Sequence, residues 1–335
     1  MLHFSQDIGI DLGTSNVRVH VQGKGVVLRE PCVVAVDLEK NRVISIGQAA
    51  AEMLGRVPPH IEVVQPMVDG VIANSTVAVQ MLEHIFRKVC GANRLFKPRV
   101  LLAVPSGATS VQTRAIRHSA ISAGAGTAET IEEPMAAALG AGLPIAAAGG
   151  NLVVDVGGGT TDIAVLSLDG IVISRSIAMG GIRFDDTIAR HVKGRYNVSI
   201  GDRTAEEIKI AIGSATSLAS ETKYDIRGRD LVTGLPRGIT LTSTEVREAL
   251  SEALAQITLR IKSVLEKTPP DLVSDIMERG ITLTGGGAQL RNLDRLISHT
   301  TNVPTHLAAD PMSCVVLGIG KALSEGRCIP TFPTA

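Results

Sequence analysis

The feature that most constrains the fold is a short pattern that occurs twice. Residues 8–19 read IGIDLGTSNVRV, and residues 153–165 read VVDVGGGTTDIAV. In both copies apolar or β-branched residues lead to an aspartate, the chain passes through glycine and threonine, and a second β-branched stretch follows. That order predicts a strand, a tight turn and a second strand. The wide separation of the copies indicates an internal duplication rather than a solenoid, whose repeats are roughly 20 to 50 residues long.

The length of the chain leaves room for two such units. A chain of 335 residues is longer than one hydrophobic core usually requires, so we expect two lobes. Strand patterns alternate with helix patterns, as in RVLLAVP (99–105) followed by TSVQTRAIRHSAISAG (109–124), which predicts an α/β fold. Residues 134–154 carry no charge, but they are rich in Ala and Gly. We therefore expect a short helix, a turn and a strand entry there, not a membrane span.

Charge and cysteine content argue against several classes of function. Lys+Arg and Asp+Glu both number 33, so the overall charge gives no reason to expect nucleic acid as a partner. The four cysteines include no C-x-x-C pair, so neither a zinc site nor a redox motif is indicated. Asp7 and Asp11 precede any apolar run that would form a secretory signal, and we expect a cytosolic protein.

Three glycine-rich turns follow predicted strands, namely GTSN (13–16), GGGTT (157–161) and GGGA (285–288). No G-x-x-x-x-G-K-[ST] motif occurs, which excludes a P-loop. Each turn alone is also the pattern of an ordinary hairpin. Glycine tolerates positive φ and lacks a Cβ, so two such turns facing each other would clamp a phosphate chain. Asp11 and Asp155, at the strand ends, are hard oxygen groups suited to holding Mg²⁺ through water.

Two other acidic positions have both a structural and a functional interpretation. Glu132 and Glu133 precede Pro134 where a strand leads into a helix, and the helix dipole alone favours acidic residues there. Beside a nucleotide clamp, a carboxylate at this place would orient or deprotonate an attacking water. Glu206 and Lys209 share one helix face, which is most often a solvated ion pair of about 0.2–0.5 kcal/mol. The functional alternative is a wall of a nucleoside pocket.

Six segments spread over nearly the whole chain narrow the interpretation: DLGTSN, EEPMAAALGAGLPI, VVDVGGGTTDIAV, TAEEIKIAIGSA, IRGRDLVTGLPR and TLTGGGAQL. Together and in this order they resemble the bacterial actin family of MreB and Mbl. The two hairpins alone are common to actins, heat-shock chaperones and sugar kinases, whereas the second and fifth segments are typical of the MreB-like proteins.

This resemblance implies an actin-like ATPase fold, with two duplicated ribonuclease-H-like lobes and a nucleotide cleft between them. We expect lobe I at residues 1–145, with a small subdomain at about 33–75. Lobe II would then span residues 146–335, with a small subdomain at about 182–255. ATP and Mg²⁺ are the cofactors that the resemblance implies.

The resemblance also implies roles for individual residues. The first phosphate loop is Gly13, Thr14, Ser15 and Asn16, and the second is Gly157, Gly158, Gly159, Thr160 and Thr161. Asp11 and Asp155 are the Mg²⁺ residues, and Glu133 is the water-activating carboxylate, grouped with Asp155 and Thr161 as catalytic. Thr161 and Asp162 lie beside the γ-phosphate. The nucleoside is enclosed by Glu206, Lys209, Gly285, Gly286, Gly287 and Ala288. Ile182 departs from the family, which usually has an acidic residue there.

A basic stretch suggests a membrane contact. No acidic residue lies between His84 and Ala128. The basic residues in that window are Arg87, Lys88, Arg94, Lys97, Arg99, Arg114 and Arg117. Leu95 and Phe96 are adjacent apolar residues among them, and the resemblance implies a loop here that attaches to the cytoplasmic membrane, sometimes helped by the N-terminus. The alternative is a dipeptide folded back on its own lobe. Nucleic acid is disfavoured, because no interleaved aromatic platform is present.

The function that the resemblance implies is an ATP-dependent, membrane-associated cytoskeletal filament that determines rod shape by organising peptidoglycan synthesis. Slow ATP hydrolysis would be coupled to polymerisation. The implied partners are further copies of the chain in paired protofilaments, the inner surface of the cell membrane, and cell-wall elongation proteins of the MreC, MreD, RodZ and RodA type. One alternative is a soluble small-molecule kinase of the same superfamily. Another is a chaperone, which would require a separate peptide-binding domain.

Overall fold

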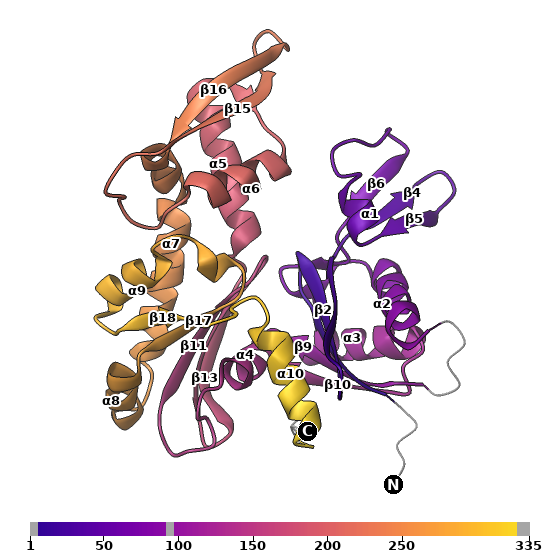
Figure 1. Ribbon diagram of the computed structural model, residues 1–335, viewed down its shortest axis with the longest axis vertical. Coiled ribbons are helices and arrows are strands. Elements are labelled where there is room, and N and C mark those ends of the chain that lie inside the picture. Colours follow the sequence, from indigo (N-terminus) through magenta and orange to yellow (C-terminus); the bar gives the residue numbers. More distant parts are fainter. Residues whose placement is uncertain (1–5, 92–96, 327–335) are drawn as a thin grey trace.

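The computed structural model describes residues 6–91 and 97–326. Two lobes lie side by side in Figure 1, and each contains one five-stranded sheet. We call them lobe I, with the sheet order β10-β9-β1-β2-β3, and lobe II, with the order β13-β12-β11-β17-β18. When one order is read in reverse, the two match strand for strand, with β1 equivalent to β11, β2 to β12 and β9 to β17.

The sheet of lobe I begins at the first hairpin. Its strands are β1 (Asp7–Leu12), β2 (Asn16–Val21), β3 (Gly25–Pro31), β9 (Arg99–Val104) and β10 (Thr127–Glu132). β1 pairs antiparallel with β2 and parallel with β9. The helices α2 (Ser75–Cys90) and α3 (Ser110–Ser122) pack against it. Alternation along β2, with Val17, Val19 and Val21 buried, gives the sheet its apolar face.

The sheet of lobe II repeats this plan. Its strands are β11 (Asn151–Val156), β12 (Thr161–Ser167), β13 (Gly170–Ile177), β17 (Ile281–Thr284) and β18 (Thr305–Leu307). β11 pairs antiparallel with β12 and parallel with β17, as β1 does with β2 and β9. The lobe is completed by α8 (Pro270–Arg279), the 3-10 turn η1 (Gly287–Gln289) and α9 (Leu293–Thr301). The duplication predicted from the hairpins is therefore present in the strand order.

Each lobe also carries a smaller sheet at the upper end of Figure 1. In lobe I this sheet comprises β4 (Val34–Asp37), β5 (Arg42–Ile46) and β6 (Ile61–Val64), with α1 (Gln48–Ala51) beside them. In lobe II it comprises β14 (Val198–Ser199), β15 (Lys223–Asp230) and β16 (Pro236–Thr242). The helices α5 (Gly181–Tyr196), α6 (Asp202–Ile212) and α7 (Ser243–Leu265) support it. The exact boundaries of lobes and subdomains remain a prediction.

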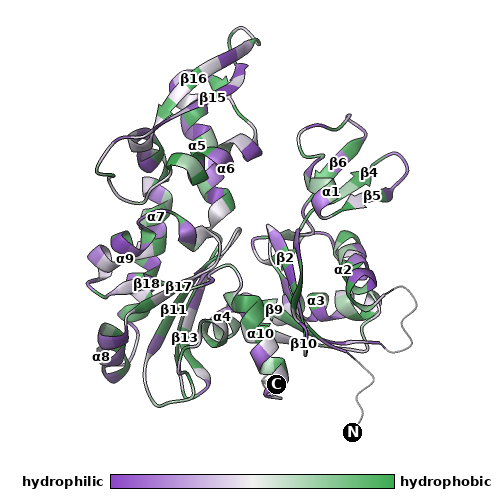
Figure 2. Ribbon diagram, viewed as in Figure 1, coloured by the Kyte–Doolittle hydropathy of each residue, from purple (hydrophilic) through white to green (hydrophobic). Residues whose placement is uncertain are grey.

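The helices α4 (Glu133–Ala141) and α10 (Cys314–Ser324) lie between the lobes (Figure 1). They pack backbone to backbone, since a Cβ on Gly140 would lie 1.7 Å from the Cys314 carbonyl oxygen and a Cβ on Gly318 would lie 1.7 Å from that of Ala136. α10 is strongly hydrophobic in its first turns (Figure 2), and Ile319 is fully buried. Because α4 contacts strands of both sheets, and α10 packs on α4 and on the sheet of lobe I, the two helices join the lobes at one place.

The uncharged stretch 134–154 forms most of α4, a loop and the first part of β11, as predicted. Within the two described ranges, no helix is both long and apolar enough to cross a bilayer. The hairpin of β7 (Met67–Val68) and β8 (Val71–Ile72) packs Met67 and Ile72 on the core of lobe I.

Candidate functional site

The two repeated hairpins meet at their turns. Gly13 N donates to Asn16 O at 3.1 Å, and Gly157 N donates to Thr160 O at 2.8 Å, so the two turns have the same closure. A Cβ on Gly158 would lie 2.2 Å from Ser15 Oγ, and a Cβ on Gly159 would lie 2.5 Å from Thr14 Oγ1. The second loop requires glycine because the side chains of the first loop occupy that space. Sequence reasoning placed both loops at the site, and the structure brings them together.

The first residues of α5 donate hydrogen bonds to the second loop. Gly181 N donates to Gly157 O and Ile182 N donates to Gly158 O, both at 2.9 Å. A Cβ on Gly180 would approach the same two carbonyl oxygens at 2.6 and 2.7 Å. Ile182 therefore contributes its backbone to the loop, which any residue type can do.

Asp11 and Asp155 occupy equivalent positions beneath the loops. Asp11 faces Arg18 across the β1–β2 ladder, with Oδ2 3.6 Å from Arg18 Nη1. Burial raises the Asp11 pKa to about 6, an effect that Arg18 opposes and Asp155 reinforces. The pKa of Asp155 is likewise raised by burial to about 6, although Thr284 Oγ1 donates to its Oδ1 at 2.6 Å. Both residues are buried, with 8% of Asp11 and 6% of Asp155 exposed.

Two further carboxylates complete the group. Asp162 is fully buried, and burial raises its pKa to about 7. Its Oδ1 accepts from Ser106 N of lobe I at 2.9 Å, whereas its Oδ2 is buried without a hydrogen-bond partner. The pKa of Glu133 lies well above its usual range, because of burial first and then the nearby charges of Asp162, Asp155 and Asp11. Burial also raises the pKa of Glu132.

This arrangement fits a hydrated divalent cation. Four acidic groups raise one another's pKa or are buried together, and one carboxylate oxygen has no partner. Among the residues described, no three His, Cys, Asp or Glu side chains converge closely enough to ligate a metal ion directly. A Mg²⁺ ion held through water, as predicted, agrees with both the buried acidic groups and the lack of three directly ligating side chains among the described residues. The fully buried Thr161 hydroxyl, by contrast, donates to Met179 O at 2.6 Å.

The predicted nucleoside residues lie along one side of the second loop. Lys209 on α6 contacts Asp185 at 2.9 Å and donates to Gly181 O at 3.2 Å. Burial raises the pKa of Asp185 to about 6, although Lys209 opposes that shift. Glu206, one turn earlier on α6, is exposed. Lys209 thus bonds the first turn of α5, and the ion pair with Glu206 weighed from the sequence does not form.

The third glycine turn packs against the end of β11. Gly285 has φ +87°, and a Cβ there would lie 2.3 Å from Val156 O. A Cβ on Gly287 would lie 2.9 Å from Gly157 O, so this turn contacts the second phosphate loop. Gly286 is more open, and Ala288 is buried beneath the turn. The structure therefore gathers all three glycine turns at one site.

Some residues of the site were not anticipated from the sequence. They are Arg18, Ser106, Thr284 and Asp185, together with the turn at Asp69 and Gly70. The D-G dipeptide of that turn is a recognisable turn signal. Its position against the phosphate loops depends on the assembly of both lobes.

Comparison with known proteins decides the family. Residues 5–329 match the family model described as MreB/Mbl protein. The chain belongs to the MreB/Mbl family. It is 50% identical over 326 residues to the cell shape-determining protein MreB of Escherichia coli strain K12, which covers 96% of this chain and 94% of the relative. It is 48% identical over 327 residues to the cell shape-determining protein Mbl of Bacillus cereus, with 98% of each chain covered.

Solved structures agree with this family. MreB5 of Spiroplasma citri bound to ADP is 41% identical and has a TM-score of 0.92, with 96% of this chain and 97% of that chain covered. The same protein bound to AMPPNP gives a TM-score of 0.91. A MamK double helical filament, at 21% identity and a TM-score of 0.80 over 96% of this chain and 99% of that chain, shows the same fold. The predicted actin-like fold is confirmed.

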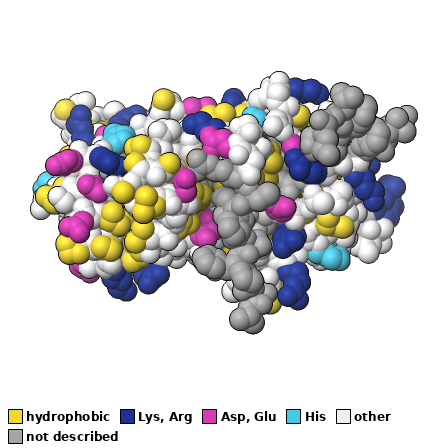
Figure 3. Space-filling model, turned by 90° about the horizontal axis from the view of Figure 1, so that it is seen from below, with side chains coloured by type: hydrophobic (Ala, Val, Ile, Leu, Met, Phe, Trp, Pro, Cys, Tyr) yellow, Lys and Arg dark blue, Asp and Glu magenta, His cyan; other side chains and the backbone are white. Residues whose placement is uncertain are grey.

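The predicted membrane residues of this MreB/Mbl chain, Leu95 and Phe96, lie outside the described residues. Around them, part of the basic window is neutralised by distant acids. Arg99 bonds Asp7, with Nε 2.7 Å from Oδ1, and Lys88 pairs with Glu30. Seen from below in Figure 3, Lys and Arg side chains nevertheless gather on the lobe I side, whereas hydrophobic side chains gather under lobe II.

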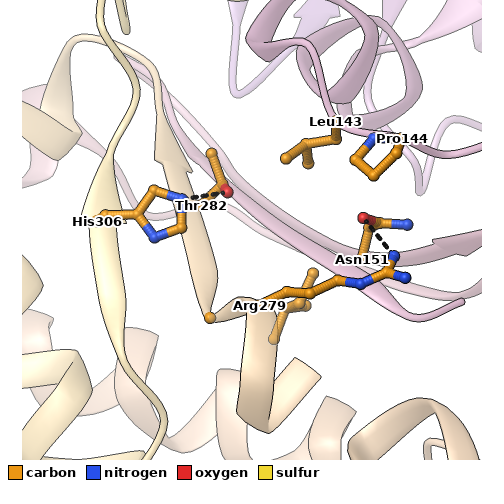
Figure 4. Close-up of a pocket in the computed structure, with 8 residues that line it drawn as sticks. Leu143, Pro144, Asn151, Arg279, Thr282 and His306 are labelled. Atoms are coloured by element: carbon orange, nitrogen blue, oxygen red, sulfur yellow. Dashed lines mark hydrogen bonds between the residues drawn. The ribbon is translucent and has the colours of Figure 1, made fainter. Parts of the chain in front are cut away.

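A separate cavity of about 400 Å³ lies at the base of lobe II (Figure 4). Its polar side chains bond to one another: Arg279 Nη1 lies 3.3 Å from Asn151 Oδ1, and Thr282 Oγ1 lies 3.0 Å from His306 Nε2. Asn151 begins β11 whereas Asp155 lies near its end, so roughly 13 Å of strand separates the cavity from the carboxylates. The cavity is not part of the site at the hairpin turns.

Proposed function

We propose that the chain is an ATP-dependent cytoskeletal filament protein that determines rod cell shape. The observation that carries the proposal is the contact between two phosphate loops from different lobes above a group of buried carboxylates. A ligand bound by both lobes would hold such a site closed. The relative position of the lobes would therefore depend on whether the nucleotide is bound. The curated relatives named as cell shape-determining proteins support the cellular role.

The proposed ligand is ATP with Mg²⁺. Structures of the Spiroplasma citri relative with ADP and with AMPPNP support a nucleotide in the cleft. Bound Mg²⁺ would supply positive charge next to the phosphates. We assign Asp11 and Asp155 to hold its water shell, and the two glycine-containing loops to cradle the phosphates with their backbone N–H groups. Gly285–Ala288, Lys209 and Glu206 would border the nucleoside.

Glu133 is the proposed proton acceptor for hydrolysis. It starts α4 at the junction of the lobes, and its raised pKa reflects burial beside three aspartates. A buried carboxylate with a raised pKa accepts a proton more readily than an exposed one with an ordinary pKa. Thr161 would act beside the γ-phosphate after releasing its bond to Met179 O, and Asp162, bonded to Ser106 across the cleft, would position that side of the site.

The proposed partners are further copies of the chain, the inner membrane surface and cell-wall elongation proteins of the MreC, MreD, RodZ and RodA type. Membrane attachment is assigned to Leu95 and Phe96. Fully burying each side chain contributes roughly 1.5–3 kcal/mol, and each basic residue at an anionic surface adds about 1 kcal/mol. One copy would bind weakly, and a filament with many copies would bind by avidity. Peptidoglycan organisation would follow from that location.

Sedimentation with ATP, Mg²⁺ and anionic lipid vesicles tests this proposal. We expect ATP-dependent pelleting of the wild type and recovery of filaments with the vesicles. Replacing Leu95 and Phe96 by Ser should abolish vesicle recovery while pelleting without lipid persists. A protein that stays monomeric with ATP and phosphorylates a small metabolite would instead establish the soluble kinase alternative.

A further inference from the structure

A tight turn of lobe I lies between the two phosphate loops. It is formed by Asp69 and Gly70, which connect β7 to β8 and both have positive φ, at 49° and 76°. Gly70 N donates to Thr14 Oγ1 of the first loop at 3.2 Å. On the other side, a Cβ added to Gly159 of the second loop would lie 3.2 Å from Asp69 Cα. The turn therefore contacts both loops at once.

The space for this turn is closely defined. A Cβ on Gly70 would lie 2.4 Å from Pro105 Cγ and 3.2 Å from Thr160 Cγ2. A non-glycine residue at Asp69 in the left-handed region is uncommon and is tolerated best by Asp or Asn. The backbone is thus held in a less favourable conformation at the point where the two loops approach.

An ion pair connects this turn to lobe II. Asp69 Oδ2 lies 3.6 Å from Arg183 Nη2, and Arg183 Nη1 lies 3.6 Å from Asp186 Oδ2 within α5. Arg183 follows Ile182, whose N–H donates a hydrogen bond to Gly158 O of the second loop. The Asp69–Arg183 pair therefore ties the first turn of α5, and with it the second loop, to the turn of lobe I.

We propose that Asp69 and Arg183 are a positioning pair that keeps the two phosphate loops together and slows release of the bound nucleotide. This inference rests on the proposed nucleotide site. A nucleotide held by both loops leaves when the lobes separate, and separation breaks the pair. Neither residue needs to touch the reacting atoms, since the pair acts through the loop positions.

The expected size of the effect is modest. The side chains of Arg183 and Asp69 are 48% and 34% exposed, so water and salt screen the attraction. Exposed ion pairs of this kind correspond to a change of about two- to fivefold in a rate or an equilibrium. Gly70→Ala should have a larger effect, because it combines an unfavourable φ with a collision at Pro105.

The test is the dissociation rate of a fluorescent ATP analogue from the full chain with Mg²⁺, chased with unlabelled ATP. We expect Asp69→Asn and Arg183→Gln each to release the analogue about two- to fivefold faster. The double variant should release it no faster than either single variant, because both changes break the same pair. Arg183→Lys should retain most of the slow release.

Two controls separate a positioning role from general damage. Asp186→Asn removes the other partner of Arg183 and should release the analogue no faster than the wild type. Added salt should accelerate release from the wild type more than from Asp69→Asn. Wild-type release rates in both single variants, or additive effects in the double variant, would overturn the positioning pair. If the wild type does not bind the analogue, the proposed nucleotide site itself is wrong.

Discussion

The two hairpins occupy equivalent places in their lobes but differ in the residue that faces the aspartate of the first strand. In lobe I, Asp11 faces Arg18 across the β1–β2 ladder. At the equivalent position of lobe II, Asp155 faces Asp162 across the β11–β12 ladder. Opposite charges face each other in the first hairpin and like charges in the second, and directly opposed like charges are destabilising. Lobe II therefore carries an electrostatic cost that lobe I avoids.

The turns differ in a complementary way. Thr14 and Ser15 of the first loop correspond to Gly158 and Gly159 of the second. Ser15 contacts Gly158 and Thr14 contacts Gly159, so the loops pair crosswise and side chains of one occupy the space left by the other. The duplicated halves have thus become two different parts of one site. A chain with two identical copies would lose this fit.

The largest expected effect is that of replacing Glu133, whose pKa is raised by burial and by aspartates of both lobes. Glu133→Gln removes the proposed proton acceptor while keeping its shape, so steady-state phosphate release should fall by about 10²–10⁴-fold. Affinity for ATP should change little. The neighbouring Glu132→Gln is the matched control, and it should leave the rate within a few-fold of the wild type. Equal losses in both variants would contradict the assignment of Glu133.

A second prediction breaks the crosswise pairing of the loops. Gly158→Ser introduces a side chain where Ser15 Oγ already lies, with the Cβ at 2.2 Å from it. Overpacking of about 1–3 kcal/mol corresponds to a loss of ATP affinity of about 5- to 150-fold. Adding Ser15→Gly should restore part of that loss, because it removes the colliding oxygen.

The control for this prediction is Gly170→Ala at the start of β13, where the nearest atom to an added Cβ is Ser167 O at 3.6 Å. It should bind ATP as the wild type does. If Ser15→Gly fails to rescue Gly158→Ser, the loops are not complementary in the way that the distances indicate.

A third and smaller effect tests the difference in charge between the hairpins. Asp162 has a pKa of about 7 in the folded chain against an ordinary 3.8, so folding binds a proton between these values. Stability of the nucleotide-free protein should therefore fall as pH rises from about 4 to about 7. Asp162→Asn should remove part of that fall and be more stable above pH 7, by on the order of 1 kcal/mol or ~2–4 °C in Tm.

Thermal unfolding in EDTA at pH 4.5 and pH 8 provides this comparison. Asp11→Asn is the matched change in lobe I, where Arg18 already compensates the charge, and its gain should be smaller. A larger gain for Asp11→Asn than for Asp162→Asn would show that the like-charged pair is not the main electrostatic cost.

Much of the architecture followed from the sequence because it is encoded locally. Both hairpins were predicted from the Asp-x-Gly turns and from the β-branched stretches around them, such as the alternating valines of β2. The repetition of this pattern predicted the duplication. A small subdomain was predicted at about 33–75, but the three strands of its sheet β4–β5–β6 were not, and neither was the helix α8. The strands of that sheet are short, and α8 follows the long helix α7 after a few residues. The sequence predicted two glycine turns that face each other, and they do; it did not predict that Ser15 and Thr14 fill the space beside Gly158 and Gly159.

The remaining features depend on contacts between distant segments. Ser106 reaches Asp162 across the lobes, and the turn at Asp69 fits between loops that no local pattern connects. The basic window illustrates the same limit, since Glu30 and Asp7 neutralise two of its members from elsewhere in the chain. Sequence patterns identified the chemistry of the site, and the assembled lobes determine how its groups pair.

We propose that two unlike loops close on one nucleotide and that hydrolysis accompanies assembly. It is tested most directly by measuring ATP-dependent phosphate release per molecule over a range of protein concentrations, with pelleting recorded in the same samples. We expect phosphate release per molecule to stay low until a threshold protein concentration and to rise where pelleting begins. A constant rate per molecule across the range, with all protein remaining in the supernatant, would contradict it.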